Sequence, residues 1–183
     1  AMANSVVRVS NCEISNFQNA GVLSLGRTTN TVNRNLQPNP EVTYCRIKGF
    51  TRNTTSNTSG SHGTSGINAG YMAVFGGRGV VQNNFIDSCT NTGSGIGAGI
   101  ALIDPFTHTI GGNNRTLANT VTANEVGLYF ERQVVPVGLF PPTFTIQNNT
   151  FAYNGNGLSG ATATGGVLLN DKPAGAYTLN VSQ

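Results

Sequence analysis

The feature that most constrains this chain is an internal repeat. Five short segments share one pattern, an apolar residue inside a polar, asparagine-rich stretch; they span residues 9–17, 42–50, 81–89, 117–125 and 146–154. Their central apolar residues are Ile14, Ile47, Ile86, Val121 and Phe151, at intervals of 33, 39, 35 and 30 residues. Repeats of this length are typical of solenoids, in which each repeat buries its apolar face against its neighbours. The repeat therefore predicts a stack of similar coils.

Each repeat also contains two further apolar segments with strand character. A glycine-led strand follows the central segment, at residues 20–26, 69–76, 98–104, 126–132 and 165–171. Another short strand precedes it, near Val9, Val42, Val81, Ile110 and Ile146. None of these segments has helical periodicity, and tight two-residue hairpin turns do not separate them, which argues against an antiparallel sandwich. We therefore expect one all-β domain over residues 1–183, with about five coils and three short strands per coil.

Side-chain alternation along a strand predicts which residues of the central segments face inward. The inward positions two residues before the central apolar residue are Cys12, Cys45, Asn84, Asn119 and Asn149. Buried asparagines need hydrogen-bond partners, so we expect the three amides to stack and bond along the solenoid axis. Outward positions place Glu13 next to Arg46 and Lys48 next to Asp87 on adjacent coils, as cross-strand charge pairs.

The cysteines leave two alternatives open. Cys12 and Cys45 occupy equivalent positions in consecutive repeats, while Cys89 aligns with Phe17 and Phe50. Stacked free cysteines that fill the core are the favoured interpretation, and a Cys12–Cys45 disulfide at the distance of neighbouring strands is the alternative. A metal site is not expected, because there is no Cys-x-x-Cys and because His62 and His108 fall in what we interpret as unrelated loops.

The stretch from Thr109 to Glu131 carries the clearest family signal. It reads TIGGNNRTLANTVTANEVGLYFE, with an Ile-Gly-Gly turn, an asparagine-flanked strand and a Gly-apolar-x-apolar strand. It resembles the repeat of bacterial right-handed parallel β-helix proteins, and the other coils match more loosely. That family has a pectate-lyase-like fold and includes lyases, polygalacturonases, epimerases, phage tailspikes, adhesins and surface-layer components. The resemblance therefore implies a right-handed parallel β-helix without implying one function.

Composition excludes several functional classes. Only 9% of residues are charged, and the ten basic residues are scattered, so nucleic-acid binding is not expected. No stretch is long enough to span a membrane. We interpret residues 1–3, Ala-Met-Ala, as a cloning remnant, and the chain as part of a larger extracellular or cell-surface protein. A neighbouring domain or a homo-oligomer is expected to cover the solenoid ends.

Three carboxylates are the candidates for catalysis. Asp104, Glu131 and Asp171 each end the third strand of a coil, with Glu131 one residue out of register with the other two. Coils about 4.8 Å apart would place neighbouring carboxylates at separations near those of glycosidases. However, Arg132 and Lys172 directly follow two of these acids, so a structural charged ridge is an equally simple interpretation. The dense acidic cluster of calcium-dependent lyases and the sequence signatures of polygalacturonases are absent.

Binding candidates are the aromatic residues expected on the surface and one basic residue: Tyr71, Phe85, Tyr129 and Arg132. A regular threonine ladder does not extend across all coils from Thr120, Thr122 and Thr150, which argues against ice binding. The leading hypothesis is a non-enzymatic extracellular module, structural or adhesive, that contacts a polysaccharide or a cell-surface glycan without a cofactor. The alternative is a polysaccharide-active enzyme, a glycoside hydrolase or tailspike-like depolymerase, that uses the three carboxylates.

Overall fold

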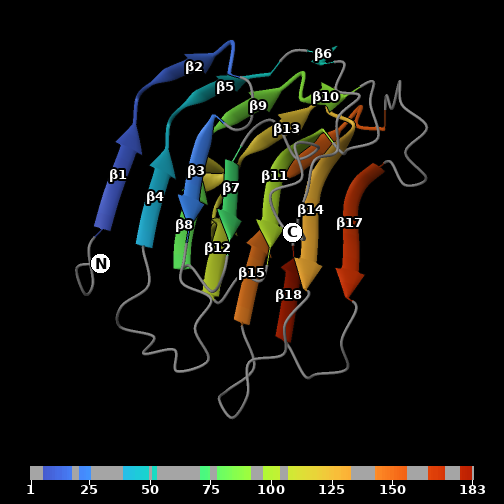
Figure 1. Cartoon of the computed structure of the whole chain (residues 1–183). Coiled ribbons are helices and arrows are strands. Elements are labelled where there is room, and N and C mark those ends of the chain that lie inside the picture. Colours follow the sequence, from blue (N-terminus) through green and yellow to red (C-terminus); the bar gives the residue numbers. More distant parts are fainter. Residues whose placement is uncertain are drawn as a thin grey trace.

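The fold is a stack of short parallel strands wound into coils (Figure 1). The computed structural model describes residues 6–17, 21–25, 39–49, 51–52, 71–74, 78–91, 97–103, 107–132, 143–155, 165–171 and 178–182. Every strand pairing within these residues is parallel, and each strand pairs with the equivalent strand of the neighbouring coil. This topology is a parallel β-helix, as the repeat predicted.

Three sheets run along the stack. Sheet A consists of β1 (Val6–Ser10), β4 (Asn39–Thr43), β8 (Arg78–Gln82), β12 (Thr107–Gly111), β15 (Thr143–Gln147) and β18 (Thr178–Ser182). Sheet B consists of β2 (Glu13–Ser15), β5 (Arg46–Lys48), β9 (Phe85–Asp87), β13 (Thr120–Thr122) and β16 (Thr150–Ala152). Sheet C consists of β3 (Val22–Leu25), β7 (Tyr71–Val74), β11 (Ala98–Ile103), β14 (Val126–Arg132) and β17 (Gly165–Asp171). A small fourth sheet pairs β6 (Thr51–Arg52) with β10 (Thr90–Asn91).

Single residues in the left-handed conformation make the corners on either side of sheet B. The corners before its strands are Asn11, Tyr44, Asn83 and Asn148, and those after them are Asn16, Ser88, Ala123 and Tyr153. Asparagine tolerates a positive φ better than most residues, which explains half of these positions. In the fourth coil the first corner is replaced by a 3-10 turn, η2 (Arg115–Leu117), whose N-cap Asn114 accepts a hydrogen bond from the Thr116 N–H. One-residue corners let each coil change direction without a long loop.

The interior is filled by rows of identical or similar apolar side chains. The central row is Ile14, Ile47, Ile86, Val121 and Phe151, all in direct register as predicted. Sheet A adds the row Val9, Val42, Val81, Ile110 and Ile146. The middle members of both rows have no exposed surface, whereas Ile14 and Phe151, in the first and last coils of sheet B, are only partly buried. Burial therefore depends on having a coil on each side.

The predicted asparagine stack is confirmed and crosses three coils. The Nδ2 of Asn84 donates to the Oδ1 of Asn119 at 3.0 Å, and the Nδ2 of Asn119 donates to the Oδ1 of Asn149 at 2.8 Å. The same amides also bond to backbone groups, including the carbonyl of Val81 at 2.7 Å. We call this row the first asparagine ladder.

A second asparagine ladder, which the sequence interpretation missed, runs along the opposite corner of sheet B. Asn124 accepts from the Cys89 N–H at 2.9 Å and donates to the Oδ1 of Asn154 at 3.1 Å. It explains the glycine-led strands. A Cβ on Gly99 would lie 2.9 Å from the Nδ2 of Asn124, and a Cβ on Gly127 would lie 2.8 Å from the Nδ2 of Asn154. The glycines therefore make room for the amides of the ladder.

The structure corrects the interpretation of His108. It was expected in a loop, but it lies in β12, opposite Gly79 of β8, and only 1% of its surface is exposed. Its position two residues before the inward-facing Ile110 places it on the interior side of sheet A. Burial lowers the pKa of His108 to about 3, so the imidazole is neutral at physiological pH. His62 lies outside the described residues.

The residues of the expected charge pairs lie opposite each other, as predicted, but the ion pair that forms joins different residues. Glu13 lies opposite Arg46 and Lys48 opposite Asp87, as predicted. Among the described side chains, however, Arg46 forms its ion pair with Asp87, at 4.0 Å, rather than with Glu13. The guanidinium reaches diagonally across the pleat, because the ring of Phe85, directly beside it, holds it by a cation–π contact at 5.4 Å.

Candidate functional site

The outer face of sheet B is an exposed surface that runs along the stack of coils. One outward row consists of Glu13, Arg46, Phe85, Thr120 and Thr150. The second consists of Ser15, Lys48, Asp87, Thr122 and Ala152. Apart from Ser15, the first three coils therefore present charged or aromatic side chains, while the last two present only short ones. Phe85 lies at the boundary between these two parts of the face, with Arg46 on one side and Thr120 on the other.

Phe85 is held in place on the side of the second coil. It is 40% exposed, and the Arg46 guanidinium lies 5.4 Å from its ring centroid. Arg46 is in turn anchored by Asp87, whose Oδ1 accepts a 2.7 Å hydrogen bond from the Ser88 hydroxyl. The Asp87 side chain is only 10% exposed, so its charge is directed to Arg46 and Ser88 rather than to solvent. On the side of the fourth coil, Phe85 faces the shorter Thr120.

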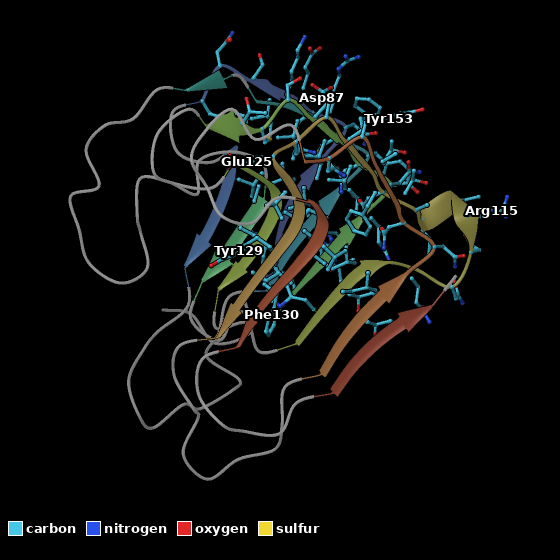
Figure 2. The ribbon with its side chains drawn as sticks, turned by 90° about the vertical axis from the view of Figure 1, so that its right-hand side faces the viewer. Asp87, Arg115, Glu125, Tyr129, Phe130 and Tyr153 are labelled. Atoms are coloured by element: carbon cyan, nitrogen blue, oxygen red, sulfur yellow. The ribbon has the colours of Figure 1, made fainter. Side chains whose placement is uncertain are left out.

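A second exposed aromatic lies on the other side of the threonines. Tyr153, at the last corner of sheet B, is 85% exposed. Figure 2 shows it on the same side of the molecule as Asp87, the strand neighbour of Phe85. Tyr153 is two coils and three residues from Phe85, which corresponds to about 14 Å across the sheet. We call Phe85, Thr120, Thr122, Thr150 and Tyr153 the aromatic platform.

The predicted binding residues have three different outcomes. Phe85 is exposed, as expected. The expectation that Tyr129 is exposed is wrong, because only 4% of its surface is accessible. Tyr129 alternates with the inward-facing Leu128 and Phe130 and projects from the other side of β14 (Figure 2), but residues 126–130 are buried on both faces of the strand. Tyr71 and Arg132 lie in β7 and β14, and their side chains are outside the described part of the chain.

The acidic candidates end neighbouring strands, with the offset that the sequence predicted. Glu131 lies opposite Asn170, and Asp171 lies opposite Arg132. The two carboxylate residues are therefore one register position apart rather than direct neighbours across the sheet. Their side chains, and the whole of Asp104, lie outside the described residues. A catalytic role for the three remains a prediction.

Glu125 is a carboxylate whose structural role the sequence did not reveal. It is fully buried beside the second asparagine ladder, and its Oε2 accepts a 2.8 Å hydrogen bond from the Gly97 N–H. Its own N–H donates to the carbonyl of Cys89 at 2.9 Å. Glu125 thus ties the turn after β13 to the start of β11. Within the described residues, no group of three or more His, Cys, Asp or Glu side chains is arranged to hold a metal ion.

The comparison with known families agrees with the architecture. A family model described as "Right handed beta helix region" matches residues 2–172. The chain belongs to this family. The predicted right-handed parallel β-helix is therefore confirmed both by the match and by the parallel register of the sheets. No curated protein and no solved structure matches the chain. For this β-helix, the family defines the fold and leaves the function open.

Proposed function

We propose that this β-helix is a non-enzymatic extracellular module that binds glycan chains on the aromatic platform. The observation that carries the proposal is the pair of exposed aromatic rings, Phe85 and Tyr153, on either side of a surface of short hydroxyl side chains. Sugars have apolar faces that pack on aromatic rings and hydroxyl groups that bond to polar side chains. The platform offers both kinds of contact.

The dimensions of the platform favour an extended ligand over a single sugar. Phe85 and Tyr153 are about 14 Å apart across the sheet, which exceeds the width of one sugar ring. Thr120 and Thr122 are partly buried and Thr150 is exposed, so their hydroxyls lie at the surface between the two aromatic residues. The cation–π contact with Arg46 restricts the Phe85 ring before binding and so reduces the entropy cost of ordering it.

The charges around the platform support binding rather than hydrolysis. Glycoside cleavage needs a general acid and a second carboxylate on either side of the bond that breaks. Among the described side chains of the sheet B strands, the carboxylates are Glu13 and Asp87, and Asp87 is engaged by Arg46 and Ser88. At the end of sheet C, Arg132 lies directly opposite Asp171, which favours a structural charge pair there.

A glycan array probed with the full chain tests the proposal, followed by calorimetric titration of the glycans that bind. Phe85→Ala and Tyr153→Asn should each weaken binding about tenfold, the effect of losing one aromatic contact. Tyr44→Asn is the matched control, because Tyr44 is 54% exposed and has the same left-handed backbone as Tyr153 but lies outside the platform. Asparagine tolerates that conformation in both variants.

A parallel assay of reducing-sugar release separates binding from catalysis. We expect binding without release. Release that is lost in Glu131→Gln or Asp171→Asn would contradict the non-enzymatic proposal and favour the polysaccharide-active enzyme. If the array gave no signal, or if Tyr44→Asn weakened binding as much as Tyr153→Asn, glycan recognition by the platform would be excluded.

A further inference from the structure

Cys12 and Cys45 lie side by side on the first two coils. They precede Glu13 and Arg46, which are direct partners in sheet B, and they follow Asn11 and Tyr44 at equivalent corners. The Arg46 N–H donates to the carbonyl of Cys12 at 2.9 Å, which fixes the two backbones at neighbouring-strand distance. Neighbouring strands are about 4.8 Å apart, and this separation falls within the range of Cα distances that a disulfide spans.

The two thiols are directed to the same region of the first coil. The Sγ of Cys12 donates to the carbonyl of Ser10 at 3.2 Å. The Sγ of Cys45 lies 3.3 Å from the carbonyl of Thr43 on its own coil and 3.5 Å from that of Val9 on the coil before it. Burial raises the pKa of Cys45; a backbone hydrogen bond at Cys12 partly offsets this rise, and a side-chain hydrogen bond with Cys12 adds to it. Both thiols are reduced in this structure.

Cys12 and Cys45 occupy, in the first two coils, the position that the asparagines of the first ladder occupy in the later coils. In the third to fifth coils, this position carries Asn84, Asn119 and Asn149, whose amides bond one coil to the next. The first and second coils have cysteines instead, so no amide side chain joins them here. The first coil is also more open to solvent at this position, since Cys12 is exposed while Cys45 is buried.

We propose that Cys12 and Cys45 form a disulfide in an oxidising environment, which links the first two coils covalently where the asparagine ladder is missing. Because Cys12 is exposed, its thiolate attacks one sulfur of a small disulfide such as oxidised glutathione and releases one glutathione thiol. The Cys45 thiolate then attacks the Cys12 sulfur of the mixed disulfide and releases the second glutathione. Across the two steps, the protein loses two protons and two electrons, and the small disulfide gains them and becomes two glutathione thiols.

The experiment incubates the folded full-length chain with oxidised or reduced glutathione and counts free thiols under denaturing conditions. We expect the count to fall from three to one, with a mass loss of two hydrogens and a cross-linked peptide that joins residues 12 and 45. Closing a loop of this size should raise the melting temperature by about 5–10 °C. Cys89→Ser is the matched control: Cys89 is buried elsewhere in the core, and this variant should form the same cross-link.

The remaining outcomes would overturn the proposal. Three free thiols after oxidation would mean that the sulfurs do not approach each other. A glutathione that stays attached to Cys12, or a dimer joined through Cys12, would mean that Cys45 does not complete the exchange. Peptide mapping of the oxidised wild-type chain distinguishes these results. The test therefore does not require that Cys12→Ser or Cys45→Ser folds.

Discussion

The amide of Asn84 donates to the amide oxygen of Asn119 at 3.0 Å, from one coil to the next and inside the protein. Asn119 has no exposed surface, so this is a polar contact in a place where most solenoid positions are apolar. An unbonded amide there would be costly, and each amide therefore requires its counterpart on the next coil at the same height. The ladder thus holds the register of successive coils more strictly than apolar packing alone would.

Asn119→Ala should therefore be strongly destabilising. The substitution removes the oxygen that accepts from Asn84 and one of the two donors to the Oδ1 of Asn149, and it leaves the carbonyl of Val81 without its 2.7 Å donor. We expect the free energy of unfolding to fall by about 2–4 kcal/mol in urea denaturation. Asn113→Ala is the control: Asn113 is exposed beside η2, and its loss should change stability by less than about 0.5 kcal/mol. Similar losses in both variants would contradict a structural role for the ladder.

Gly127→Ala and Gly166→Ala test the link between the glycine row and the second ladder. An added Cβ on Gly127 would lie 2.5 Å from the carbonyl oxygen of Gly166 and 2.8 Å from the Nδ2 of Asn154. On Gly166, in the next coil, the nearest atom would be the Cβ of Phe151 at 3.8 Å. Thermal unfolding should show a loss of about 1–3 kcal/mol for Gly127→Ala and little change for Gly166→Ala. Equal tolerance of both would refute the steric explanation.

The burial of His108 predicts a pH dependence of stability. Its folded pKa is about 3, below the ordinary value of 6.5. Between these values the unfolded chain binds a proton that the folded chain does not, so stability falls as the pH is lowered from 6.5 toward 3. The slope from this one group is at most about 1.4 kcal/mol per pH unit.

Urea denaturation at pH 7 and pH 4.5 checks this dependence, with His108→Leu compared with the unmodified chain. The variant has no imidazole to protonate, so its stability should fall less between the two pH values. The comparison subtracts the contribution of the carboxylates, which both proteins share. If the two proteins lost the same stability on acidification, His108 would have to be protonated or exposed in the folded state.

Several errors of the sequence interpretation share a physical cause. Alternation showed that Tyr129 points away from the core, but burial of the outer face of β14 depends on what else packs there, which a local pattern does not contain. The sequence interpretation places His108 in a loop, whereas its register with Gly79 places it in β12. In both residues, contacts with other parts of the chain outweighed the local pattern.

The sequence by itself determined the repeat, the parallel β-helix and the register of the central row, because every coil must present an apolar residue at the same height to bury it. It also identified the first asparagine ladder and the exposure of Phe85. Only the tertiary structure decided which polar groups meet across coils, namely the second ladder with its glycines and the choice of Asp87 over Glu13 by Arg46. It also placed Tyr153 on the same side of the molecule as Asp87 (Figure 2). These relationships join residues 25 or more positions apart, and their distances follow from the winding of the whole stack rather than from any one segment.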